Sequence, residues 1–322
     1  MKKGTFIISL DFELHWGVSD HRTVESYYEN LKNTPAVVEK LLELFAQRHI
    51  HATWATVGML FCHNKNELNA FVPANLRPSY VHDRLSNYKV AETAGRNELE
   101  DPFHYANSLI KKIITTPGQE LATHTFSHYY CLEPGQVADQ FYADILAAIK
   151  ITSREGVQPI SIVFPRNQYN DAYLDKCRQA GIKAYRGNLS SWLYRAEAKS
   201  SESRIKRLFR LADSYLPVSG YRLVIPQISN SMLNIPGSCF LRPYNRKLSG
   251  FEWMRLRRIK NEMTKAAEKG MTYHLWWHPH NFGKNMQQNF QILDSVLAHF
   301  ESLSEKFGME SLNMKEVYEK WQ

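Results

Sequence analysis

The sequence predicts an α/β protein with a largely parallel sheet or barrel covered by helices. Short apolar segments alternate with longer amphipathic segments along the 322 residues. The short segments show little polar alternation, which is typical of strands buried on both faces. Polar residues capable of chemistry follow five of these segments, and active sites gather where parallel strands end.

The first predicted strand, residues 5–10, leads directly into an acidic pair, Asp11 and Glu13. A helix is expected next, because Thr34 is a good N-cap and Pro35 suits the first helical position. The chain therefore places two carboxylates at the end of its first strand, before any helix begins.

A second strand is predicted at 52–57, and residues 60–117 then form a polar and aromatic stretch. This stretch is much longer than the roughly 2–6 residues that usually connect such elements, so we interpret it as an insertion that walls a site. Part of it, residues 102–114, has a helical pattern. The remaining elements alternate as before, and we expect strand 120–123, helix 135–149, strand 160–164, helix 171–180, strand 182–185, helix 251–269, strand 272–277, helix 288–307 and helix 314–321.

A second insertion is expected at about residues 190–250, where strand-like fragments follow a basic amphipathic segment. Such a helix can lie on a membrane surface. The more common arrangement packs the apolar side on the protein's own core, and we expect that arrangement here. The apolar positions are Ile205, Leu208, Phe209 and Ala212, and the basic ones are Arg204, Lys206, Arg207 and Arg210.

The composition is ordinary for a globular protein, but the net charge of +8 admits an acidic partner. We interpret this charge as a solubility property and expect no nucleic-acid partner, because no nucleic-acid-binding module is recognisable. The four cysteines are far apart, which argues against a disulfide framework or a cysteine zinc site. No apolar run suits a signal peptide or a transmembrane span, so we expect a cytoplasmic protein.

Two histidines, His124 and His128, have the spacing of metal ligands. They share one face if the second lies one helical turn after the first. Histidine is the commonest metal-binding side chain, but zinc usually takes three or four protein ligands. A carboxylate from the acidic pair at the end of the first strand could complete the site.

Taken in order, the motifs resemble those of the polysaccharide deacetylase family, the NodB-homology enzymes of carbohydrate esterase family 4. The matching segments are Ser9-Leu-Asp-Phe-Glu13, His51-Ala-Thr-Trp-Ala-Thr-Val-Gly58, His124-Thr-Phe-Ser-His128, Phe164-Pro-Arg-Asn167 and Leu275-Trp-Trp-His278. The resemblance implies a distorted parallel (β/α) barrel. We expect one deacetylase-like catalytic domain over residues 1–322, with the two insertions described above.

The resemblance also implies the roles of the strand-end residues. Asp11 would be the general base, and Glu13, His124 and His128 would bind a divalent metal. We expect zinc, although this set of ligands also suits iron, cobalt, manganese or nickel.

The same resemblance assigns the general acid to His278, with His280 as its rival. Arg166 is expected to keep Asp11 ionised, because an adjacent cation lowers the pKa of a carboxyl group. The family's fourth motif normally supplies an acid that tunes the catalytic histidine, whereas residues 188–192 here contain none.

Substrate contacts are expected from Trp16, Tyr129, Trp192 and His280. The backbone N–H groups of Tyr129 and Tyr130 are also candidates for holding an oxyanion.

These roles describe a metal-dependent amidohydrolase. It would remove an N-acyl group, acetyl or formyl, from an amino sugar or sugar conjugate in surface-polysaccharide biosynthesis. The substrate could be nucleotide-linked or lipid-linked. The alternative is a degenerate, non-catalytic glycan-binding relative, which the missing acid of the fourth motif supports.

Overall fold

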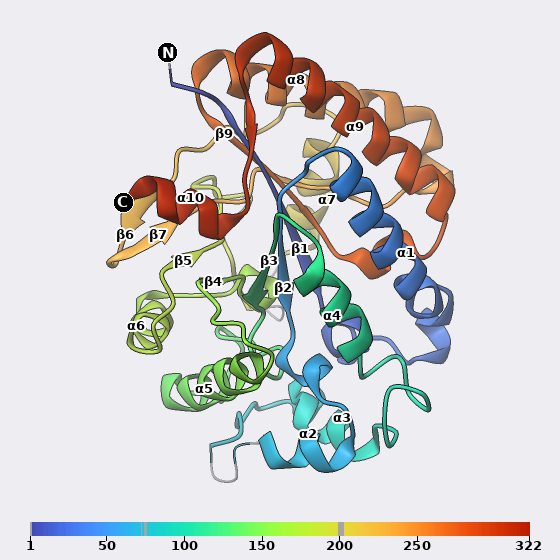
Figure 1. The fold of residues 1–322 in the computed structure, drawn as a ribbon, viewed down its shortest axis with the longest axis vertical. Coiled ribbons are helices and arrows are strands. Elements are labelled where there is room, and N and C mark those ends of the chain that lie inside the picture. The colour runs from blue at the N-terminus through green and yellow to red at the C-terminus, as the bar shows by residue number, and fades with distance from the viewer. Residues whose placement is uncertain (1, 72, 74–75, 199–202) are drawn as a thin grey trace.

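A curled, mostly parallel sheet forms the centre of the computed structural model, which describes residues 2–71, 73, 76–198 and 203–322 (Figure 1). The strand order is β6-β7-β5-β4-β3-β2-β1-β9-β8, and β10 pairs with β1. Among these strands only β6 and β7 run antiparallel. The described strands are β1 (Thr5–Phe12), β2 (Ala52–Thr56), β3 (Gln119–Thr123), β4 (Ser161–Ile162), β5 (Ala184–Tyr185), β6 (Gln227–Ser229), β7 (Met232–Asn234), β8 (Cys239–Phe240), β9 (Thr272–Trp277) and β10 (Glu310–Ser311).

Helices cover the outside of this sheet, with α1, α4, α8 and α9 packed over β1, β2 and β9 (Figure 1). Helices α5 and α6 pack on each other beside β4 and β5. The predicted distorted (β/α) barrel is therefore confirmed. The described helices are α1 (Tyr28–Gln47), α2 (Lys65–Phe71), α3 (Asn87–Thr93), α4 (Asn107–Thr115), α5 (Ala138–Arg154), α6 (Asp171–Gln179), α7 (Arg204–Asp213), α8 (Glu252–Lys269), α9 (Met286–Phe307) and α10 (Met314–Trp321).

Strand alternation decides which residues face the inside of the curled sheet. Small and branched side chains from five strands pack together there with Met314 and Val317 of α10. In β1 the inward residue is Ile7, whereas Phe6 and Ile8 belong to the outer core under the helices. Because side chains alternate along a strand, Asp11 lies on the same side as Ile7. The acidic pair thus continues the inner row of β1 beyond the packed core.

Helix α1 begins earlier than predicted. It starts at Tyr28, so Pro35 lies inside the helix, and the Thr34 hydroxyl donates to the carbonyl of Asn30 instead of capping the N-terminus. The extra turns are held by tertiary contacts, because the Asn30 side-chain amide donates to the His280 carbonyl. A local sequence pattern cannot reveal such a contact with residues far along the chain.

The two predicted insertions differ in what they contribute. Residues 60–117 hold α2, α3 and α4 outside the sheet. Residues 190–250 hold α7 but also β6, β7 and β8, so part of this stretch belongs to the sheet itself. Within the described parts of the chain, no helix is both long and apolar enough to cross a bilayer.

Candidate metal centre and catalytic groups

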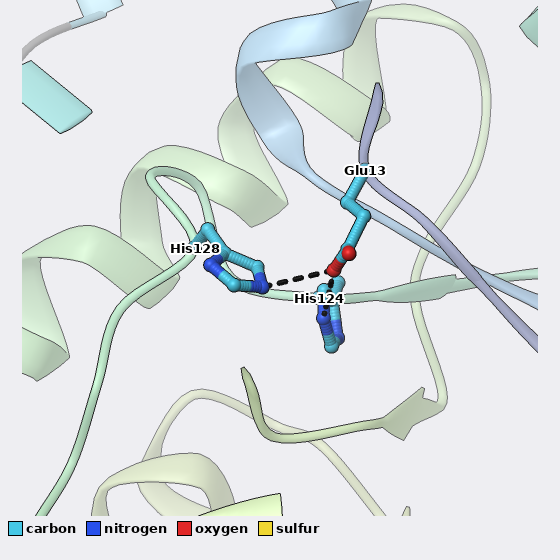
Figure 2. A group of neighbouring side chains, drawn as sticks. All are labelled: Glu13, His124 and His128. Carbon is cyan, nitrogen blue, oxygen red and sulfur yellow. Dashed lines mark ion pairs between the residues drawn. The ribbon is translucent and has the colours of Figure 1, made fainter. Parts of the chain in front are cut away.

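Glu13, His124 and His128 lie close together just beyond the carboxyl ends of β1 and β3 (Figure 2). Glu13 Oε2 lies 2.9 Å from His128 Nε2 and 3.3 Å from His124 Nε2, and all three side chains are buried. Glu13 Oε2 has no hydrogen bond of acceptable geometry among the described residues. A buried oxygen left without such a bond beside two imidazole nitrogens fits a metal ion, because each of these atoms can serve as a ligand.

The far nitrogens of the two imidazoles fix their orientation. His124 Nδ1 lies 2.7 Å from the Val163 carbonyl and must donate to it, which leaves the lone pair on Nε2. His128 Nδ1 contacts the Tyr130 hydroxyl at 3.1 Å. Burial lowers the pKa of His128, which favours the neutral form that binds metals. This arrangement matches the outer hydrogen bonds that usually orient metal-binding histidines.

The loop between the two histidines is not helical, so the condition under which they would share a helical face is not met, and the loop backbone brings them together instead. Thr125 and His128 both have positive φ angles, 65° and 59°. The buried carboxylate of Asp144 on α5 holds the loop by accepting bonds from Phe126 N at 2.7 Å and Ser127 N at 3.2 Å. The sequence offered no signal for this contact, because an aspartate inside an amphipathic helix is ordinarily exposed.

Gly17 is a further residue that the sequence interpretation missed. A Cβ atom at this position would lie 1.9 Å from Glu13 Cδ and 2.0 Å from Oε1. Only glycine therefore leaves room for the Glu13 side chain in its present position. The sequence offered a partial signal, because a glycine four residues after a candidate metal ligand can allow the ligand side chain to approach the backbone closely.

Arg186, not Arg166, is the cation beside Asp11, which corrects the prediction from sequence. Its guanidinium group makes a bidentate contact with Asp11, at 2.6 Å from Nη1 to Oδ1 and 2.8 Å from Nη2 to Oδ2. Both side chains are buried. Burial alone would raise the pKa of Asp11, but the charge of Arg186 lowers it overall. Asp11 is thus a buried carboxylate that its arginine partner keeps ionised.

Arg166 points elsewhere because it sits in a left-handed turn after β4, with φ at 55°. Its guanidinium group pairs with Asp20 at 2.6 Å and with Glu133 at 3.0 Å. It also stacks on the Tyr130 ring at 3.9 Å, and Tyr130 contacts the metal-ligand candidate His128. Arg166 therefore reaches the site through Tyr130 and not through Asp11.

His278 lies between the two carboxylates, with Nε2 at 3.7 Å from Asp11 Oδ2 and 3.6 Å from Glu13 Oε1. The sequence offers no fourth-motif acid for His278, and Asn281 Nδ2 instead lies 3.2 Å from His278 Nδ1. The Tyr27 hydroxyl donates to Asn281 Oδ1, so the amide presents its N–H to His278. His278 therefore accepts at Nδ1 and carries its proton on Nε2, facing the carboxylates.

His280 is the more deeply buried of the two rival histidines. Its Nε2 lies 3.8 Å from Glu13 Oε1, and burial lowers its pKa to about 3. The His278 side chain is 23% exposed and is the one that a substrate can reach.

The three other side chains expected to contact the substrate do not lie together: two are buried in the protein interior and one is exposed at the surface. Trp16 is fully buried and its indole N–H donates to the His104 carbonyl, so it packs inside the protein. The Tyr129 side chain is also buried, in the core beside α5 and α6. Trp192 is exposed, and its ring lies beside Phe209 of α7.

Neither candidate N–H group for the oxyanion is available. Tyr129 N donates to Thr125 Oγ1, and Tyr130 N donates to the Tyr80 hydroxyl, each at 2.7 Å. The expectation that one of these two N–H groups holds the oxyanion was therefore wrong.

Comparisons with known proteins place the fold. No family model and no curated protein matches the sequence. Among solved structures, a Mycobacterium smegmatis protein described as a polysaccharide deacetylase is 12% identical, with a TM-score of 0.62 over 99% of this chain and 91% of that one. One from Pseudomonas aeruginosa PAO1, described likewise, is 12% identical, with a TM-score of 0.59 over 98% and 89%.

A third solved structure, the Puue allantoinase, is 11% identical, with a TM-score of 0.58 over 98% of this chain and 89% of that one. At these identities the likeness concerns the fold alone. The chain has the fold of polysaccharide deacetylases, and the resemblance inferred from its motifs is confirmed at that level.

Proposed function

We propose that the chain is a metal-dependent amidohydrolase that removes an N-acyl group, acetyl or formyl, from an amino sugar or sugar conjugate. The observation that supports this proposal most strongly is that the two carboxylates of the acidic pair have different partners. Glu13 faces His124 and His128, whereas Asp11 is held by Arg186. Two carboxylates with different partners can take different roles.

Glu13, His124 and His128 would hold a divalent metal, zinc by our expectation, and such a metal supplies a Lewis acid that polarises an amide carbonyl. Asp11 is the general base, because its pairing with Arg186 keeps it ionised and an ionised carboxylate can accept a proton from the attacking water. Arg186 holds both carboxylate oxygens and so fixes the orientation of the base.

His278 is the general acid of the proposed reaction. Its Nε2 proton faces the same space as Asp11, and its partial exposure gives access to a leaving amine. An amine leaves readily only after protonation, and His278 would provide that proton from its imidazolium form, with the Asn281 amide turned so that its oxygen accepts from Nδ1–H. Asn281 acts as a positioning residue, because its side-chain amide bonds to His278 Nδ1 and so orients the ring.

A role in surface-polysaccharide biosynthesis, with a nucleotide- or lipid-linked amino sugar as substrate, is part of the same proposal. It is supported by the fold shared with two proteins described as polysaccharide deacetylases. The cytoplasmic location expected from the sequence belongs to the proposal as well.

The test is a panel of N-acetyl and N-formyl amino sugars, assayed for released acetate and formate. Wild type should release one of these acids. Asp11→Asn should release neither while it keeps its metal and its cooperative unfolding transition. An Asp11→Asn protein that still released acetate or formate would refute the assignment of Asp11 as the general base. A folded, metal-loaded wild type that binds glycans without turnover would favour the non-catalytic alternative.

A further inference from the structure

A cavity of about 380 Å³ lies at the carboxyl ends of β5, β8 and β9 and shares Arg186 with the catalytic groups. Its volume falls within the range of small-molecule sites. Trp276, Gly187 and Gly237 form part of its wall. We call it the arginine cavity, because its described lining contains Arg166, Arg186, Arg195, Arg210, Arg222 and Arg242.

Three of these arginines have carboxylate partners among the described residues, and Arg242 has none there. Arg166 and Arg186 have the acidic partners given above, and Arg222 pairs with the buried Glu262 at 2.8 Å. Glu197 is the one acid in the described lining, and its carboxylate binds Lys206 at 2.9 Å. The cavity is therefore strongly cationic.

Arg242 shows the imbalance most clearly. Its Nε donates to Ser214 Oγ at 2.7 Å, but no carboxylate of the described chain lies within ion-pair distance. Burial lowers the pKa of Arg242, and the neighbouring charge of Arg210 lowers it further. A partly buried guanidinium group without a counter-charge is costly, and an anion in the cavity would remove that cost.

We propose that the arginine cavity binds a phosphate group carried by the substrate, so that the amino sugar reaches Asp11 as a phosphate conjugate. This rests on the proposed amidohydrolase function. Guanidinium groups suit phosphate, because their forked donors match its oxygens and they remain charged. The Trp276 ring, which already stacks on Arg186 at 4.2 Å, gives the intervening sugar an aromatic wall.

The test is calorimetric binding of inorganic phosphate to the purified protein and three variants. Arg242→Gln should weaken binding by about tenfold or more, because a charge-assisted bond is lost. Arg242→Lys keeps the charge, so its phosphate affinity should lie between those of wild type and Arg242→Gln. His124→Ala should bind phosphate as wild type does, because it alters only the metal site.

Phosphate that binds Arg242→Gln as tightly as wild type, or that does not bind wild type at all, would overturn the proposal. Phosphate lost in His124→Ala would also overturn it, because the anion would then sit at the metal. Failure here is distinct from failure of the proposed function, which is measured by acid release from N-acyl sugars without phosphate.

The sequence predicted that the apolar side of α7 packs on the core, but in the structure this side faces the solvent. Ile205 and Leu208 are each 65% exposed, and Phe209 is 43% exposed. The buried side chains of this helix are Lys206 and Asp213. These two positions are seven residues apart and lie on one helical face, so the helix is polar toward the protein and apolar toward solvent.

Polar contacts fix this orientation. Lys206 Nζ binds Glu197 Oε1 at 2.9 Å, and the Asp213 carboxylate accepts from Ser219 N at 2.7 Å and pairs with Arg258 at 3.2 Å. Turning the helix over would break these contacts and bury its exposed arginines. The exposed apolar side is therefore a stable feature of the fold.

We infer that this side docks on a bilayer that contains anionic lipids. Between residues 203 and 212 the sequence has no acidic residue, so exposed cations accompany the apolar side chains. That combination complements a negatively charged interface, where basic groups meet headgroups and apolar groups enter the acyl boundary. The α7 face consists of Trp192, Arg204, Ile205, Arg207, Leu208 and Phe209.

The test is cosedimentation of the full chain with vesicles of phosphatidylcholine alone or mixed equally with phosphatidylglycerol. Binding should require phosphatidylglycerol, and a variant carrying Ile205→Ser and Leu208→Ser should bind about tenfold more weakly or worse. Leu99→Ser is the matched control, because Leu99 is 95% exposed on another part of the surface. It should bind as wild type does.

Equal binding by wild type and the double variant, or no binding by wild type, would overturn the inference. Self-association of wild type that the double variant lacks, without vesicle binding, would instead assign the α7 face to contact with a second copy of the chain.

Discussion

Replacing Arg186 by methionine tests the pairing that keeps the base ionised. Both partners are buried, with donor–acceptor distances of 2.6 and 2.8 Å. The substitution would leave the Asp11 carboxylate buried without a cation, which costs about 3–5 kcal/mol. Since domains have only about 5–15 kcal/mol of stability, the loss should be plain in urea denaturation near neutral pH.

The double variant Arg186→Met with Asp11→Asn is the matched control. It removes the lone charge and should recover most of the lost stability, but it should have no activity because the base is gone. The cost should also depend on pH. The pKa of Asp11 is lowered in the folded wild type, so the stability it contributes is present above the ordinary carboxyl pKa and is lost as pH falls through the folded value.

The reasoning is refuted if Arg186→Met unfolds at the same urea concentration as wild type. It is also refuted if adding Asp11→Asn destabilises the protein further, because the buried charge would then not be the cause.

Three other substitutions probe the surroundings of the site and the sheet. Gly17→Ala should abolish metal binding measured by elemental analysis, whereas Gly250→Ala, with nothing within 4 Å of its Cβ, should not. Asp144→Ala should lower metal affinity about 10–100-fold in titrations, while Asp144→Asn retains an acceptor and should lose less. Glu316 raises the pKa of His51, so the stability that this pair contributes should fall as pH rises above the ordinary histidine pKa and through the folded one. His51→Gln should therefore make the midpoint of urea denaturation depend less on pH in that range.

Strand alternation explains why much of the site could be predicted. Asp11 and Glu13 follow a recognisable strand, and every second residue of β1 faces inward. The same rule covers Arg186, two residues after the inward Ala184. Its role could therefore have been found by carrying the alternation past the end of each strand.

The remaining errors come from contacts between distant parts of the chain. Helix α1 begins before its sequence signals because Asn30 bonds to residues after β9. The orientation of α7 depends on Arg258, 45 residues beyond Asp213 in the sequence. Local patterns describe which faces a helix has, but only tertiary partners decide which face is buried.

Metal content tests the proposed site most directly. Wild type purified without chelators should carry about one divalent metal per chain by elemental analysis, and His124→Ala should carry none. A wild type without metal that also takes up no zinc, cobalt or manganese would contradict the assignment of Glu13, His124 and His128 as ligands.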